Sequence, residues 1–202
     1  MSITRAKTSS IAQGPSTNRN LLAGNSAILS GSYESIQTVN VTAAGGQATV
    51  SFTSIPSTYT HLQIRAINRS TRAGSGYDYL LAQVNSDTAA NYSWHLLYGN
   101  GTTVAASSTA SSNSMGLGFD PQASATANAF GVTIIDILDY ANTNKYKTFR
   151  SLVGSDTNDT NGAVGLASGS WRSTSAITSI TLSNNVSGNL AQYSSFALYG
   201  IK

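Results

Sequence analysis

The sequence predicts an all-β protein: a single β-sandwich, of the jelly-roll type, with an extended N-terminal arm. Two observations lead to this prediction. Apolar and polar residues alternate in about ten short segments, with Gly, Pro, Asn and Asp between them. No segment shows the 3.6-residue period of an amphipathic helix. A chain of 202 residues allows one sandwich with an appendage, or two small domains. We expect the arm over residues 1–30 and the sandwich over residues 31–202.

The composition is poor in charge and lacks cysteine. Charged residues make up 9% of the chain, against roughly a quarter in ordinary globular proteins. This composition suits a protein packed in a large assembly. The net charge of +3 comes without a dense basic patch, which disfavours nucleic acid as a partner. Disulfides and cysteine metal sites are excluded. Because we find no membrane-spanning run and no signal peptide, we expect any release from a cell to occur by lysis.

Residues 1–30 have neither a helical nor a strand period. Small polar residues separate the apolar ones, and no acidic residue precedes Glu34. Two interpretations stay open: a disordered leader, or an extended arm that orders on a partner and places its apolar residues in separate pockets. We favour an arm that is the attachment device. The residues expected to contact the partner are Ile3, Arg5, Lys7, Ile11, Arg19, Leu21 and Leu22.

The segment from 31 to 67 predicts a meander of three strands. Apolar and polar residues alternate over 39–42, 48–52 and 62–66, which gives each strand one apolar face. Gly45-Gly46 lies between the first two strands and supplies the positive φ of a tight hairpin. A meander of this kind buries one face and needs a cover from the rest of the chain.

The middle of the chain predicts two strands, a hairpin and a long loop. Strands are expected over 77–84 and 92–98, and Asn100-Gly101 is a hairpin signal that leads into a weak strand around 102–105. Residues 106–126 are nearly all small, so we predict a long loop with a short strand near 115–119. A loop of this length suggests a contact between subunits.

The strongest late pattern covers residues 129–140. Its apolar residues fall on both faces, which predicts a central strand covered on both sides or a strand at a subunit interface. Residues 146–153 are its expected hairpin partner. Further strands are expected over 162–171, 175–183 and 193–201.

Few residues are candidates for catalysis. The two histidines, His61 and His95, lie inside predicted strands, where packing or a surface hydrogen bond explains them better than a hydrolytic triad does. Glu34 is the sole glutamate, and a glycosidase needs two carboxylates facing each other. Asp136 and Asp139 have an odd separation, so a regular strand places them on opposite faces. We therefore predict that the protein is not an enzyme.

Two further patterns concern ligands. Residues 155–162 superficially resemble a calcium loop, but the spacing and the later glutamate are missing, and the chain has no Gly-Lys pair for a phosphate loop. We expect no metal and no cofactor. Six aromatic residues either line a glycan site or belong to the core and to interfaces, and we favour the second interpretation. These residues are Tyr77, Tyr79, Tyr92, Trp94, Tyr98 and Trp171.

Four stretches carry a family resemblance. They are SYESI at 32–36, FTSIPSTYTHLQIR at 52–65, IIDILDYANTNKYKT at 134–148 and SFALYGIK at 195–202. Together they resemble a group of virion structural proteins of tailed bacteriophages, many from aquatic hosts such as cyanobacteria. The resemblance spans about residues 31–202. It implies a capsid decoration (cement) protein or a piece of a tail fibre, and it brings no catalytic residues.

These arguments lead to an expected function. We expect a non-enzymatic virion component, a capsid decoration protein that attaches to the major capsid protein through its arm. The alternative is a tail-fibre or receptor-binding module that recognises host glycans. We expect a homo-oligomer, a trimer, because of the two-faced strand and the small-residue loop 106–126. Assembly in the host cytoplasm and release by lysis follow, with no nucleic acid or membrane as partner.

Overall fold

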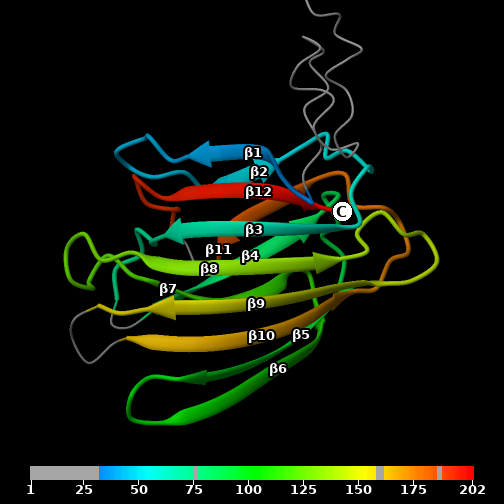
Figure 1. The fold of residues 1–202 in the computed structure, drawn as a ribbon. Helices are drawn as coiled ribbons and strands as arrows, with labels where there is room; N and C mark the ends of the chain where they lie inside the picture. Colours follow the sequence, from blue (N-terminus) through cyan, green and yellow to red (C-terminus); the bar gives the residue numbers. More distant parts are fainter. Residues whose placement is uncertain (1–31, 75–76, 158–161, 186–187) are drawn as a thin grey trace, which may run out of the picture.

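The computed structural model describes residues 32–74, 77–157, 162–185 and 188–202. These residues form twelve strands in two antiparallel sheets, and no helix occurs among them. The larger sheet lies in front of the smaller one in Figure 1. The predicted all-β sandwich is therefore confirmed.

The large sheet has eight strands and the small sheet has four. In spatial order, the large sheet consists of β1 (Tyr33–Asn40), β12 (Ser195–Ile201), β3 (His61–Asn68), β8 (Gly131–Leu138), β9 (Lys147–Ser155), β10 (Ala163–Trp171), β5 (Tyr92–Gly99) and β6 (Val104–Ser112). The small sheet consists of β2 (Thr49–Phe52), β11 (Ile180–Asn184), β4 (Tyr77–Val84) and β7 (Met115–Pro121).

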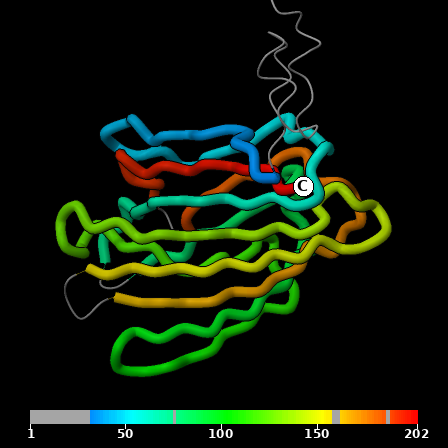
Figure 2. The backbone as a smooth tube through the Cα atoms, viewed as in Figure 1, coloured from blue at the N-terminus to red at the C-terminus, as the bar shows by residue number. Residues whose placement is uncertain are grey.

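Eight of the eleven connections between consecutive described strands cross from one sheet to the other. The other three, β5 to β6, β8 to β9 and β9 to β10, stay in the large sheet and extend it. β9 and β10 continue from β8, and the β5–β6 hairpin ends the sheet at the bottom of Figure 2. The predicted hairpin turn at Asn100-Gly101 is confirmed, with Gly101 at φ 85°.

The core lies between the sheets and follows the period of two. In β3 and β4 every second side chain is buried, and these side chains meet across the sandwich. A smaller cluster surrounds Phe119 and Val153, beside the β5 end of the large sheet. The alternate side chains of the large sheet point away from this core.

Two buried cationic side chains, Arg69 and Lys147, hold loops between strands by donating hydrogen bonds to backbone carbonyls. The Arg69 guanidinium donates to the carbonyl oxygens of Ala123, Ala125, Thr126 and Ala129, at 2.7–3.1 Å, and so holds the segment that leads into β8. Lys147 donates from Nζ to the carbonyls of Asn142, Lys145 and Thr174. Burial lowers the pKa of both groups. Backbone oxygens replace water around each charge.

The predicted meander over 31–67 is wrong in its pairing. β1 pairs with β12, β2 pairs with β11, and β3 lies between β12 and β8. The turn at Gly46 exists, with φ 76° and a bond from its N–H to the Ala43 carbonyl, but it leads from one sheet to the other. Alternation defines a strand and its faces, whereas the partner strand depends on distant residues.

The predicted loop over 106–126 is also wrong, because most of it forms β6 and β7, although the short strand expected near 115–119 is present as part of β7. β6 is built from small residues but pairs with β5 along its length. β7 is buried throughout. Its glycines admit close neighbours: a Cβ on Gly116 would lie 2.8 Å from the Trp94 ring, and one on Gly118 would lie 2.6 Å from Val153. Glycines that resemble loop residues are here required by packing. The strand expected over 175–183 is shorter and later, at 180–184.

Candidate functional site

The most unusual surface is the outward side of the large sheet, which we name the outer face. Strand register places its aliphatic side chains in two adjacent rows across six strands, from β3 to β6. The first row contains Ile67, Val132, Gly154, Val164, Gly99 and Val104. The second row contains Ile134, Leu152, Leu166, Leu97 and Ala106, beside Arg65. We call these the aliphatic rows.

The side chains of the aliphatic rows are open to solvent. Seven large ones are between 47% (Leu166) and 78% (Val104) exposed. The pattern over 129–140 predicted this arrangement in part. Ile135 and Ile137 of β8 are buried in the core, whereas Val132 and Leu138 on its other face are exposed. The described part of the chain provides no cover for that second face.

A hollow of about 940 Å³ adjoins the first row. Gly99 and Gly154 lie in this row and contribute no side chains, so a gap separates the aliphatic residues beside them. Val132, Val164 and Ile67 line it, together with the turn that follows Gly99. The outer face therefore has both a recess and, in Val104, a projecting aliphatic side chain.

The next row of the outer face is polar and internally paired. Gln63 Nε2 donates to Asp136 Oδ1 at 2.8 Å, and Arg150 Nη2 donates to Asp136 Oδ2 at 2.6 Å. Burial raises the pKa of Asp136, but these two hydrogen bonds outweigh burial and hold it below its usual range. Tyr33 donates to Gln63 and lies under Arg65, whose guanidinium carbon is 6.0 Å from the ring centre. This row adds little unbalanced charge.

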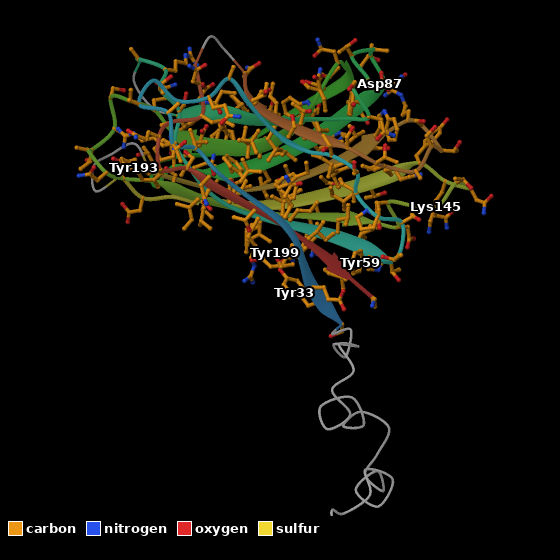
Figure 3. The ribbon with its side chains drawn as sticks, turned by 90° about the horizontal axis from the view of Figure 1, so that it is seen from above. Tyr33, Tyr59, Asp87, Lys145, Tyr193 and Tyr199 are labelled. Carbon is orange, nitrogen blue, oxygen red and sulfur yellow. The ribbon has the colours of Figure 1, made fainter. Side chains whose placement is uncertain are left out.

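Tyr33 and Tyr199 mark the β1 end of the outer face. Their rings stack with centroids 4.7 Å apart. Figure 3 shows both on the same side of the molecule, opposite Asp87.

Four of the six aromatic residues singled out in the sequence come together. Tyr77 and Tyr79 of β4 contact Phe119, with centroids 4.2 and 4.9 Å from its ring. Tyr98 contacts Phe119 at 4.8 Å, and Trp94 lies 6.5 Å from Tyr79. The rings around Phe119 are partly exposed. Burial raises the pKa of Tyr77 and Tyr79. We call this group the aromatic cluster.

The other two, Tyr92 and Trp171, are buried and hold a turn. The Tyr92 hydroxyl accepts from the Val84 N–H and donates to the Asp87 carbonyl, both at 3.0 Å, and burial raises its pKa to about 12. Trp171 Nε1 donates to Asp87 Oδ2 at 2.7 Å. Their rings face the core rather than a ligand.

The structure brings His61 and Asp139 together but keeps the two histidines apart. His61 accepts at Nδ1 from the Asp139 N–H at 3.0 Å, and the same nitrogen lies 3.6 Å from Asp139 Oδ1. His95 is exposed on β5, four strands away from β3. Glu34 accepts from the Tyr59 hydroxyl at 2.9 Å. Among the described residues no three His, Cys, Asp or Glu side chains are placed to hold a metal ion.

A buried acid pair was missed by the sequence reasoning. Asp78 and Asp120 face each other on β4 and β7, and both are fully buried. Asp78 accepts from the Ser70 hydroxyl at 2.9 Å, and Arg72 lies 3.5 Å away. Asp120 has no well-formed hydrogen bond among the described residues. Burial, and then the charge of Asp78, raises the pKa of Asp120 to about 7, and the nearby Asn68 side chain lowers this pKa only in part. Position 78 shares a face with Leu80 and Ala82, and that pattern could have revealed it.

The expected arm residues Ile3, Arg5, Lys7, Ile11, Arg19, Leu21 and Leu22 lie outside the described residues, as does part of the calcium-like segment 155–162. In the described ranges no helix is long and apolar enough to cross a membrane. Comparison of the chain with protein-family models, curated proteins and solved structures finds no match.

Proposed function

We propose that the protein is a non-enzymatic structural component of a phage virion, and specifically a capsid decoration protein that works through protein–protein contacts. The observation that carries this proposal is the pair of aliphatic rows on the outer face. Seven large aliphatic side chains, each about half exposed or more, form one continuous surface. Such a surface indicates an interaction site. The phage context comes from the sequence resemblance.

Burial of the aliphatic rows stabilises a complex strongly. Each of these side chains contributes up to roughly 1.5–3 kcal/mol when it passes from exposed to fully buried. The side chains already lose part of this because they are half covered. The aliphatic rows extend across six strands, well beyond the hollow beside them, so most of this surface lies outside the concave pocket that a small molecule needs and suits contact with a protein.

The connectivity supports the jelly-roll interpretation. Without the strands β5, β6, β9 and β10, each sheet has four strands, in the orders β1-β12-β3-β8 and β2-β11-β4-β7. In chain order, these eight strands pass from one set to the other at every step except from β4 to β7. A jelly roll has eight strands in two sheets, and capsid proteins are among its users.

The arm keeps its proposed role as the attachment device. An extended chain of 30 residues reaches on the order of 90 Å at ~3.3 Å per residue, enough to cross a neighbouring subunit. It would attach the protein to the major capsid protein, while the outer face meets another protein surface.

A second candidate is a receptor-binding module of a tail fibre, and the aromatic cluster favours it. Tyr77, Tyr79, Trp94 and Tyr98 present partly exposed rings around Phe119, and sugars stack on such faces. Binding of the purified protein to a host glycan array, lost in Tyr79→Ala and retained in Tyr146→Ala, would favour this candidate over decoration.

Electron cryo-microscopy of the particle tests the main proposal. We expect hundreds of copies, symmetrically placed on the shell, with the outer face covered by protein. Quantitative mass spectrometry of purified particles gives the copy number independently. About a dozen copies at the tail would contradict decoration, and absence from the particle would contradict any virion role.

A further inference from the structure

We propose that the protein covering the outer face is a second copy of this chain, packed sheet against sheet about a two-fold axis. This inference rests on the proposed function only in taking the outer face as an interaction surface. Area, charge and shape each support a second copy.

The area of the outer face matches a protein dimer. Eight strands spaced about 4.8 Å apart, each about eight residues long, give a face of roughly 34 Å by 26 Å, on the order of 900 Å². Stable complexes bury about 800 Å² on each partner. A second sheet that overlaps most of this face meets that requirement, whereas a single extended peptide covers only one or two strand widths.

The charge of the outer face suits contact with an identical surface. Across a two-fold axis each residue lies near its own copy or near a residue close to it, so an unbalanced charge opposes pairing. Asp136 is held between Gln63 and Arg150, and Arg65 lies over the Tyr33 ring. The aliphatic rows contain no charged side chain apart from Arg65 at one end.

The shape of the outer face supplies both halves of a complementary contact. Val104 projects from β6 with 78% exposure, and the hollow beside the first row is lined by Val132 and Val164. A surface that pairs with itself needs a projection and a recess on the same patch. In the proposed dimer Val104 of each copy faces the hollow of the other.

This geometry favours two copies over the trimer expected from the sequence. That expectation depended partly on a small-residue loop over 106–126, and those residues are mainly the strands β6 and β7. The other motive, the two-faced strand β8, remains, because its exposed face belongs to the aliphatic rows. One shared face covered by its own copy closes at two subunits.

Sedimentation velocity of the purified full-length protein from 0.1 to 100 µM tests the proposal. We expect a dimer that dissociates on dilution. Leu152→Glu places a charge in the middle of the second row and enters the interface twice, so we expect at least a 100-fold weaker dimer. Val104→Glu changes a side chain with few contacts of its own, so its fold is safe, and we expect at least a tenfold weaker dimer.

Two full-length controls locate the contact. Tyr146→Glu exchanges another exposed large residue (55%), which precedes β9 and lies outside the aliphatic rows. It should leave the dimer unchanged. A variant with Ile11, Leu21 and Leu22 replaced by Ser tests the arm and should also remain dimeric. Circular dichroism checks that every variant keeps the β fold.

A wild type that is monomeric at 100 µM overturns the inference, as does a dimer that survives both Leu152→Glu and Val104→Glu. Loss of the dimer in the arm variant also overturns it, because the arm would then be the occupant of the outer face. These outcomes are separate from the proposed function: a monomer found in many copies on the capsid refutes the inference alone, whereas a dimer absent from the particle refutes the function alone.

Discussion

The inner and outer faces of the large sheet belong to the same strands and contain similar side chains. In β9, Phe149 and Val153 point inward and are almost fully buried, whereas Leu152 between them points outward and is about half exposed. The small sheet covers the inner face within the chain. The outer face has comparable aliphatic residues in register and no cover among the described residues. The inner face therefore stabilises the fold, and the role that we propose for the outer face is contact with other chains.

The largest expected effect separates the two faces directly. Phe149→Ala should lower the free energy of unfolding by about 3–5 kcal/mol, because it leaves a cavity between the sheets. Leu152→Ala should lower it by less than about 1 kcal/mol, because Leu152 has few contacts within one chain. Urea denaturation below 0.1 µM, where copies are dissociated, measures both. Equal losses would show that the outer face contributes to the fold of the single chain.

The buried acid pair adds a pH dependence to the inner region. In the folded protein Asp120 has a pKa of about 7, against 3.8 ordinarily, so it keeps a proton that the unfolded chain loses above about pH 4. Stability from this group is complete below pH 4 and decreases as the pH rises to about 7. The total change is up to about 4 kcal/mol, at 1.36 kcal/mol per pH unit.

Asp120→Asn removes this titration without changing the shape of the side chain. Chemical denaturation of both proteins from pH 4 to 8 should show a wild type that loses stability relative to the variant as the pH rises. Parallel curves, or a wild type that gains on the variant, would contradict the assignment of a raised pKa to Asp120.

The tight packing of β7 predicts that a substitution there lowers the free energy of unfolding by a smaller amount. Gly118 has φ 123°, and an added Cβ would lie 2.6 Å from Val153, so Gly118→Ala should lower the unfolding free energy by about 1–3 kcal/mol. Gly45→Ala is the matched control, because no atom lies within 4 Å of its added Cβ. Thermal denaturation compares the two. A variant at Gly118 as stable as the one at Gly45 would show that β7 can move away from β9.

The smallest expected change in the free energy of unfolding comes from a substitution in the polar row of the outer face. Arg150 is well exposed, so Arg150→Ala should cost at most about 1 kcal/mol in the isolated chain, and less at high salt. Urea denaturation at low and high ionic strength measures this. A loss above about 2 kcal/mol would place this pair among the interactions that hold the fold.

The sequence predicted where the strands lie better than it predicted which strands pair with each other. Alternation located β3, β4 and β8, and for β3 it also assigned the buried face, because its apolar residues fall on one side. It did not predict that β1 pairs with β12, since that contact joins the two ends of the described chain. The short strand expected near 115–119 is part of β7, but its complete burial was not predicted, because its glycines serve the close approach of Trp94 and Val153, which only the assembled sandwich reveals.

The candidate site was predictable in part. Apolar residues on both faces of the segment 129–140 predicted a strand covered on both sides or one at a subunit interface, and the structure places the exposed side of β8 in the aliphatic rows. The full rows could not be predicted, because they combine single residues from six strands whose register depends on tertiary pairing. The grouping of Tyr77 and Tyr79 with Trp94 required the same information.

Thiol labelling tests most directly that the outer face is covered by a partner. The chain has no cysteine, so Leu152→Cys and Tyr146→Cys each introduce a single thiol. The experiment compares the maleimide labelling rates of both variants at 0.1 µM, at 100 µM and in purified particles. At 100 µM and in particles, the account predicts at least tenfold slower labelling at position 152 and an unchanged rate at position 146. Labelling at position 152 that stays as fast in particles and at 100 µM as at 0.1 µM would contradict the account.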